Sequence, residues 1–422
     1  MDIFNKVIAK HLPNKTEQAR IRSEIDEFIE NLEKVMKKQE ILGEVMLGGS
    51  AAKGTFLIKD FDVDVFVRFD YEYKDKDLSP MLESMLLSIK KIKFDKVHGS
   101  RDYFQSKTKK INYEIIPVLK VDDPKKALNV TDMSPLHVKW LKKHLSKNLR
   151  NEVVLAKLFC KAQHVYGAES YIQGLSGHVL DILIVYYGSF LKLLKASQNW
   201  DLLGKKNEII DVEKHNSVGK LNKSKISPLI VIDPIQPERN AAAALSKEKL
   251  NIFVIAAKEF LDKPHEKYFA RKEYNLDDLK AIKIKHCASW LLILDINALN
   301  GKEDIVGAKL LKSYKHILRH LKINEFTVKE SGWKWDKQKK AEFWYVIEED
   351  KLSKSLERMG PPVSAKNAAE GFKLKHKKAY EREDRLYAMV ERLFKTPDKL
   401  AKSMVKEEYV KEKIKSGKLK VY

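Results

Sequence analysis

The chain has 422 residues, a length that allows about two to four domains, each with a core of its own. Lysine and arginine number 81 against 59 acidic residues, and this net charge of +22, spread along the chain, favours a polyanionic partner, although a lysine-rich surface alone would also produce it. Only two cysteines occur, which favours a reducing compartment and no zinc site. There is no apolar signal core and no run of about 18 apolar residues, so we expect a cytoplasmic protein rather than a secreted or membrane protein.

The first predicted element is an amphipathic helix over residues 16–39, which leads into a strand that ends before Gly48. From there to Lys120 the pattern predicts a small mixed sheet, interrupted by a helix from Pro80 to Ile92. The helix prediction rests on apolar side chains at helical spacing, namely Ile21, Ile25, Phe28, Ile29, Leu32, Val35 and Met36.

A glycine-rich turn follows the first strand, at Gly48-Gly49-Ser50. Its backbone N–H groups can approach a triphosphate without obstruction by side chains. Twelve residues after Ser50, Asp62 and Asp64 occupy alternate positions of an otherwise apolar segment, which predicts a strand with both carboxylates on one face. Residues two apart on a strand lie about 7 Å apart, so the pair suits a site for two metal ions roughly 4 Å from each other.

A third carboxylate, Glu114, lies in a later strand-like segment over residues 110–119. A carboxylate in such an apolar strand is costly unless it is paired or binds a cation. Alone, an Asp-x-Asp pair is usually the solvated face of a strand, and a Gly-Ser turn is weaker still. In this order, however, the turn, the acidic pair and the distal acid resemble the signature of the DNA polymerase β-like nucleotidyltransferase superfamily.

The remaining chain predicts helices first and then a mixture of strands and helices. We therefore expect a multidomain α+β fold: a nucleotidyltransferase-type mixed sheet with helices, a helical domain, and a smaller α+β tail module. The expected helices span 136–165, 176–196, 247–261 with Ser246 as N-cap, 305–321 and 351–359, the last stopped by Gly360-Pro361-Pro362. The expected strands span 228–232, 326–335 and 341–347, an apolar run covers 282–294, residues 203–226 read as a mobile basic loop, and the last sixty residues read as charged and largely helical.

Five blocks downstream of the acids resemble the class I, archaeal-type CCA-adding enzyme over nearly the whole chain. They lie at 131–141, 151–157, 165–169, 174–177 and 233–240, and Arg358 to Pro361 resembles the end of the family's tail domain. The resemblance implies four domains: a catalytic head at 1–142, a helical neck at 143–225, a body at 226–275 and 363–422, and a tRNA-binding tail at 276–362.

The same resemblance implies an enzyme that adds C, C and A to the 3′ end of tRNA without a template, using CTP, ATP and two Mg²⁺ ions. The metal ligands would be Asp62, Asp64 and Glu114, and the tRNA would be gripped along its acceptor–T arm, by a monomer or a homodimer. Glutamate is usual where Asp62 stands, aspartate where Glu114 stands and arginine where Lys53 stands. The implied nucleotide-binding residues are Gly49, Ser50, Lys53, Ser134, His137, Lys157, Tyr166, Arg239 and Asn240.

Two other readings of the chain stay open at this point. Another enzyme of the superfamily, such as a poly(A) polymerase or an oligoadenylate synthetase, would differ in product length, and a non-catalytic RNA-binding relative should have lost its acids. Each nucleotide-binding residue also has an ordinary structural interpretation. His137 could be a partly buried histidine, Lys157 a solvated lysine, Tyr166 a core aromatic residue and Arg239 a surface turn residue.

Overall fold

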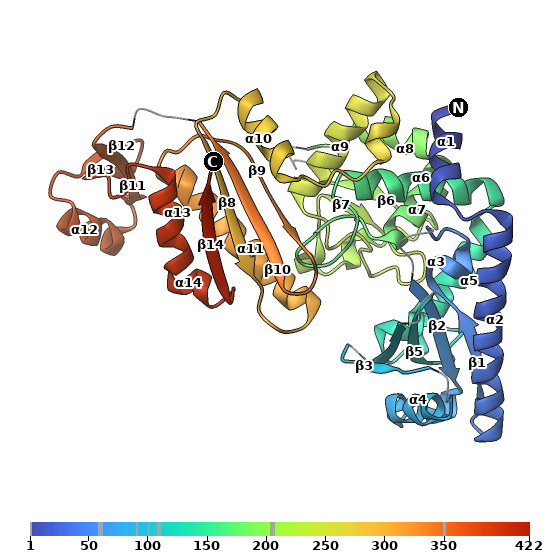
Figure 1. The fold of residues 1–422 in the computed structure, drawn as a ribbon. Coiled ribbons are helices and arrows are strands. Elements are labelled where there is room, and N and C mark those ends of the chain that lie inside the picture. Colours follow the sequence, from blue (N-terminus) through green and yellow to red (C-terminus); the bar gives the residue numbers. More distant parts are fainter. Residues whose placement is uncertain are drawn as a thin grey trace. The chain divides into compact units, whose positions relative to one another are not determined.

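The structure is a computed structural model, and it describes residues 2–57, 62–89, 92–99, 101–107, 111–202, 207–348 and 352–422. The chain divides into two compact units, Met1–Lys272 and Glu273–Tyr422 (Figure 1). Both contain helices and strands, which confirms the predicted α+β class. The expected division into head, neck, body and tail is finer than these two units and stays a prediction. Within the described ranges, no helix is long and apolar enough to cross a membrane.

The first unit begins with two helices, α1 (Asp2–His11) and α2 (Lys15–Lys38). Asn14 caps α2 by accepting a hydrogen bond from the backbone N–H of Glu17. The helix matches the predicted span 16–39 to within one residue at each end. Its apolar stripe packs on the adjacent sheet, where Phe28 lies 4.3 Å from Tyr113, measured between ring centroids.

That sheet has five strands in the order β1-β2-β5-β4-β3. Strands β1 and β2 are antiparallel, whereas β2 and β5 are parallel neighbours at the centre. The short helix α3 (Gly49–Lys53) connects β1 to β2. The helix predicted from Pro80 to Ile92 is present as α4 (Leu78–Leu87), which ends five residues earlier than expected. The strands are β1 (Gly43–Leu47), β2 (Asp62–Phe69), β3 (Asp95–Val97), β4 (Tyr103–Lys107) and β5 (Asn112–Leu119).

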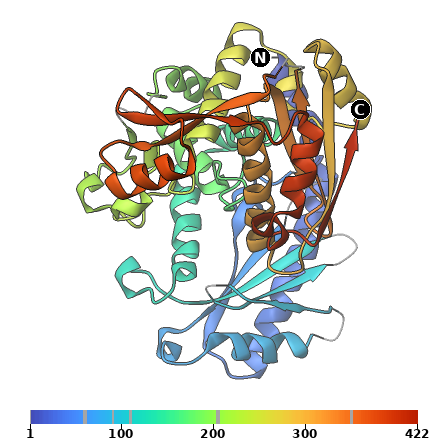
Figure 2. The same ribbon diagram turned by 90° about the vertical axis from the view of Figure 1, so that its left-hand side faces the viewer.

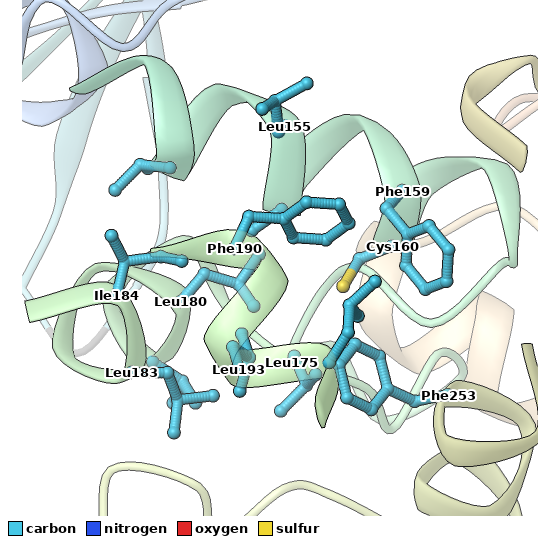
Figure 3. Packing of buried hydrophobic residues seen from close by; sticks show 14 of the residues in the cluster. Leu155, Phe159, Cys160, Leu175, Leu180, Leu183, Ile184, Phe190, Leu193 and Phe253 are labelled. Carbon is cyan, nitrogen blue, oxygen red and sulfur yellow. The ribbon is translucent and has the colours of Figure 1, made fainter. Parts of the chain in front are cut away.

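A helical layer follows and has its own core, in which Phe159, Phe190 and Phe253 pack with buried leucines (Figure 3). The single helix expected over 176–196 is wrong, because Gly188, at φ +78°, ends α7 and Ser189 caps α8. The layer comprises α5 (Ser134–His144), α6 (Lys147–Ala162), α7 (Gly177–Tyr187), α8 (Phe190–Ser197) and α9 (Lys247–Asp262).

Ser246 caps α9 as predicted, because its hydroxyl accepts a hydrogen bond from the backbone N–H of Lys249. The basic loop expected over 203–226 is only partly a loop. Its residues 208–210 form β6 (Glu208–Ile210), which pairs in parallel with β7 (Leu229–Val231) inside the predicted strand 228–232. Residues 203–206 lie outside the described residues.

The second unit is built on a four-stranded sheet in the order β14-β8-β10-β9 (Figure 2). One face packs on α11 (Glu303–Ile323), α13 (Pro397–Lys406) and α14 (Glu408–Lys411), and the other packs on α10 (Leu276–Lys285). The helix predicted over 305–321 is confirmed. The strands are β8 (Trp290–Asn297), β9 (Val328–Trp335), β10 (Lys340–Ile347) and β14 (Ser416–Val421).

Two predictions for this unit are wrong. The helix expected over 351–359 is wrong, because residues 355–362 form β11 (Ser355–Pro362), which pairs with β13 (Arg385–Glu391). The last sixty residues are not largely helical, since they also contain β12 (Tyr380–Arg382), β13 and β14, besides α12 (Lys366–Lys375). In both places strand pairing across the chain outweighs a local pattern that favours a helix.

Candidate active site

The three predicted acids meet at the junction of β2 and β5. The parallel register places Asp64 directly beside Glu114, and Asp62 lies two residues earlier on the same strand and therefore on the same face. Asp62 is exposed, whereas Asp64 and Glu114 are half-buried. The structure thus places all three carboxylates that the sequence singled out on one face of two adjacent strands.

The electrostatics of this group favour a bound cation. Burial, followed by the charge of Glu114, raises the pKa of Asp64 to about 7. Burial also raises the pKa of Glu114, although Gln105 Nε2 donates a hydrogen bond of 2.6 Å to Glu114 Oε1 and opposes that rise. Neighbouring carboxylates with raised pKa values are stabilised in the ionised form by a divalent ion. The donor set is all oxygen, which suits a hard ion such as Mg²⁺.

The glycine turn packs directly against Asp64. The Gly48 N–H donates to the Asp64 carbonyl at 2.7 Å, and Gly49 has φ +53°. A Cβ atom added to Gly49 would lie 1.6 Å from Asp64 Oδ2, so no other residue fits here without moving the carboxylate. Ser50 and Lys53 follow in α3, on the segment that this turn fixes beside the acids.

Two lysines lie near Asp64: Lys53 is partly buried and Lys157 is buried. Lys53 Nζ pairs with Asp181 Oδ2 at 2.6 Å, and Asp181, on α7, is fully buried. Lys157 is 4% exposed and donates to the carbonyl of Thr55 at 3.2 Å and to its hydroxyl at 3.0 Å. Burial lowers the pKa of Lys157 to about 8, against the attraction of Asp181. Lys157 is therefore not the solvated lysine of the ordinary interpretation.

Asp181 is a site residue that the sequence analysis did not name. It is the single charged side chain in the apolar run from Val179 to Tyr186, and that isolation was the available signal. One of its oxygens, Oδ1, has no hydrogen-bond partner within the described part of the chain.

A second cluster is centred on the buried Asp233. Its carboxylate binds His137 Nε2 at 2.8 Å, accepts from Arg239 Nη1 at 2.7 Å and lies 3.3 Å from His178 Nε2. Burial opposes ionisation, but the hydrogen bonds from His137 and His178 outweigh it and hold the pKa of Asp233 well below its usual range. Burial lowers the pKa of His137. Asp233 begins the block at 233–240 and His178 directly follows the block at 174–177, but neither was named as a site residue.

The arginine of this cluster, Arg239, is fixed by an ion pair and is still accessible to solvent. Arg239 is 41% exposed, and its guanidinium donates a hydrogen bond to Asp233. The Asp233 carboxylate accepts from five groups in all: the side chains of Arg239, His137 and His178 and the backbone N–H groups of Ile235 and Gln236. A fixed guanidinium offers donors only, in a rigid plane. Such a group can discriminate between ligands by the acceptors that they present.

The other three predicted residues differ in their surroundings. Tyr166 lies beside the start of α7, where a Cβ added to Gly177 would be 3.0 Å from its hydroxyl, and Ser134 is the first residue of α5. Asn240 is buried, and its amide is engaged by four groups of the neighbouring loops: Val231 N–H, Ala242 N–H, the Lys225 carbonyl and the Ser227 hydroxyl. The side chain of Asn240 therefore holds the β7 loop in place, and its contact with a nucleotide stays a prediction.

Three family profiles match successive parts of the chain. They are described as a nucleotidyltransferase domain at residues 29–136, a tRNA nucleotidyltransferase second domain at 151–270, and a CCA-adding enzyme C-terminal domain at 290–418. A CCA-adding enzyme of Nanoarchaeum equitans is 35% identical over 402 residues, which cover 94% of this chain and 95% of that protein. The chain belongs to the family of CCA-adding enzymes.

Further comparisons agree with this membership. The CCA-adding enzyme of Methanocaldococcus jannaschii is 31% identical, with 93% of this chain and 87% of that protein covered. A solved structure of a cytoplasmic RNA terminal U-transferase matches this CCA-adding family member with a TM-score of 0.50 and 13% identity, over 65% of this chain and 98% of the other. That likeness shows a shared nucleotidyltransferase fold. The resemblance inferred from the motifs is confirmed, and the protein is an enzyme of the nucleotidyltransferase class.

Proposed function

We propose that the protein adds C, C and A to the 3′ end of tRNA, using CTP and ATP and releasing pyrophosphate. The observation that carries this proposal is the pairing of Asp64 with Glu114 across β2 and β5, with Gly49 packed on the Asp64 carboxylate. This packing supports the proposal, because the carboxylates that would bind metal then lie against the turn that would bind the triphosphate. Family membership supplies the substrate class, because the relatives are named CCA-adding enzymes.

Asp62, Asp64 and Glu114 would hold the divalent ions, for which we propose two Mg²⁺. When bound, such ions lower the pKa of an attacking hydroxyl and neutralise the charge that develops on a leaving pyrophosphate. The all-oxygen donor set and the raised pKa of Asp64 support this assignment.

The triphosphate would be received by the glycine turn and the two lysines. Backbone N–H groups at Gly49 and Ser50 are unobstructed by a side chain at Gly49, and Lys53 and Lys157 provide positive charge behind them. Because Lys53 is already paired with Asp181, we propose that it turns from that carboxylate toward the phosphates when a nucleotide enters. Tyr166 and Ser134 would contribute further contacts to the phosphates and the sugar.

Arg239 would select the base. A guanidinium has no acceptor, so it can match the acceptors of cytosine and adenine but meets the N–H groups of guanine N1 and uracil N3 unfavourably. Asp233 would hold the guanidinium in place, and His137, hydrogen-bonded to the same carboxylate, would line the pocket.

For tRNA, we propose recognition of the acceptor–T arm through phosphate charge and A-form shape. The net charge of +22 supports it, since such contacts do not depend on base sequence. Homodimer formation and a cytoplasmic location stay predictions.

The test is incubation with tRNA trimmed of its CCA end, CTP, ATP and Mg²⁺, followed by sizing of the product. We expect three additions and then arrest, whereas tails longer than three nucleotides would support a poly(A) polymerase instead. Asp64→Ala should abolish addition while tRNA binding persists, and Asp26→Ala, an exposed carboxylate on α2, is the matched control. If Asp64→Ala kept more than about a hundredth of the wild-type kcat, a loss below ~3 kcal/mol, the metal assignment would be wrong.

A further inference from the structure

The second unit contains a cluster of potential metal ligands that the proposed reaction does not use. His316 and His320 are one helical turn apart on α11, and Glu407 lies between α13 and α14. One ligand atom from each lies within 4.8 Å of the others, and all three residues are partly buried. His316 Nε2 and Glu407 Oε2 are 2.8 Å apart.

The surrounding contacts hold two of these side chains in position. The His316 ring stacks on Tyr409, with a centroid separation of 4.4 Å and an interplanar angle of 28°. The backbone of Glu407 is fixed as well, because its carbonyl accepts hydrogen bonds from Val410 and Lys411 at the start of α14. The His320 ring lies 4.4 Å from the His316 ring on the same helix face.

We propose that His316, His320 and Glu407 bind a divalent transition-metal ion of the zinc class, which ties α11 to the corner between α13 and α14. Two imidazoles and a carboxylate are a three-ligand set that zinc accepts with a water molecule in the fourth position. Mg²⁺ prefers oxygen ligands, so this site selects a different ion from the acids of the first unit.

The geometry needs only a small adjustment to hold such an ion. Zinc bonds of about 2.0–2.2 Å place tetrahedral ligand atoms roughly 3.4 Å apart. His316 and Glu407 are 2.8 Å apart and would separate slightly, and no two ligand atoms of the group are more than 4.8 Å apart, so small side-chain rotations would form the site.

The cluster around Asp233 is the other group of three potential ligands whose atoms lie within 4.8 Å of one another among the described residues, and it is a poorer candidate. Asp233 is already bound by Arg239 and by the backbone N–H groups of Ile235 and Gln236. The expectation of no zinc site rested on the two cysteines alone. The site proposed here contains no cysteine.

The test is a Co²⁺ titration of the full-length, metal-stripped protein, with Mg²⁺ in excess to occupy the acids of the first unit. We expect the visible absorption of a tetrahedral Co²⁺ site at one ion per chain, its loss on addition of Zn²⁺, and a rise in Tm with Zn²⁺. His320→Gln and Glu407→Gln should each weaken Co²⁺ binding by more than about 100-fold, because loss of even an outer partner of a metal ligand costs 10- to 100-fold. Retained affinity in both variants, or no Co²⁺ absorption in the wild type, would overturn the proposal.

Two further variants separate metal binding from a purely structural role. His286→Gln is the matched control, because His286 pairs with Glu330 at 3.1 Å in the same unit without a third ligand among the described residues, and it should leave Co²⁺ binding unchanged. His320→Cys should restore binding, with the added absorption of a thiolate ligand. If His320→Cys matches the metal-free Tm of the wild type and yet binds no Co²⁺, the three residues are an ordinary ion-pair cluster.

Discussion

Replacing Asp64 by asparagine is expected to stabilise the first unit when no divalent ion is present, while abolishing activity. The reason is that Asp64 is half-buried beside Glu114, and burial and that neighbouring charge raise its pKa from 3.8 to about 7. An asparagine of the same shape removes the charge and can donate a hydrogen bond to Glu114.

The magnitude and the pH window follow from the pKa difference. Between pH 4 and 7 the folded chain holds a proton that the unfolded chain releases, so the contribution of Asp64 to stability falls as pH rises through that range. At 1.36 kcal/mol per pKa unit the full cost above pH 7 is at most about 4 kcal/mol. Relaxation and water at the edge of the sheet should reduce it to about 2 kcal/mol.

Calorimetry of the wild type and Asp64→Asn in EDTA measures this effect. We expect the Tm of the first unit to be about 4 °C higher in the variant at pH 8, at ~2 °C per kcal/mol, and the gain to shrink as pH falls toward 4. Mg²⁺ should raise the Tm of the wild type but not that of the variant. Asp62→Asn, which changes an exposed carboxylate, should gain little. An equal or lower Tm for Asp64→Asn at pH 8 would refute the reasoning.

Substitutions at Lys53, Glu114 and Arg239 and one pH profile test the rest of the site. Lys53→Met leaves the buried Asp181 without its ion-pair partner, so it should lower the free energy of unfolding by about 3 kcal/mol in a denaturation experiment. The double variant Lys53→Met/Asp181→Asn should recover this stability but not the activity. Burial lowers the pKa of Lys157 to about 8, and this lysine must be protonated to attract a triphosphate. The kcat/KM for CTP should therefore fall above pH 8. A pH profile of kcat/KM that stays level to pH 9.5 would contradict this role. Glu114→Asp should keep activity whereas Glu114→Gln should lose most of it in single-turnover assays, and Arg239→Ala should lower the ratio of kcat/KM for CTP to that for UTP.

Features of the fold that depend on local signals were predictable from the sequence. The α2 helix has a cap and a continuous apolar stripe, and Ser246 is followed at once by the helix that it caps. The break at Gly188 and the strand β11 were not predicted. Gly188 lies within a long apolar run that favours one continuous helix. Strand β11 depends on pairing with β13, which begins more than twenty residues later.

In the candidate site, too, the residues with a local signal were predictable and the contacts between distant residues were not. Asp62, Asp64 and Glu114 could be found because strand periodicity and an unexplained charge in an apolar strand are visible in the sequence. The direct pairing of Asp64 with Glu114 is a matter of sheet register, which the sequence did not fix. Asp181 was missed because its partner Lys53 is 128 residues away, and no local pattern links the two.

The position of β14 has a consequence for the synthesis of this protein. Strand β8 leaves the ribosome about 120 residues before β14, its neighbour in the sheet. At a synthesis rate of roughly 5–20 residues per second, the backbone groups on that edge of β8 stay unpaired for on the order of 10 s. During that interval the unpaired edge of β8 can accept a strand from a neighbouring nascent chain, so we expect molecular chaperones that shield β8 to raise the yield of this enzyme.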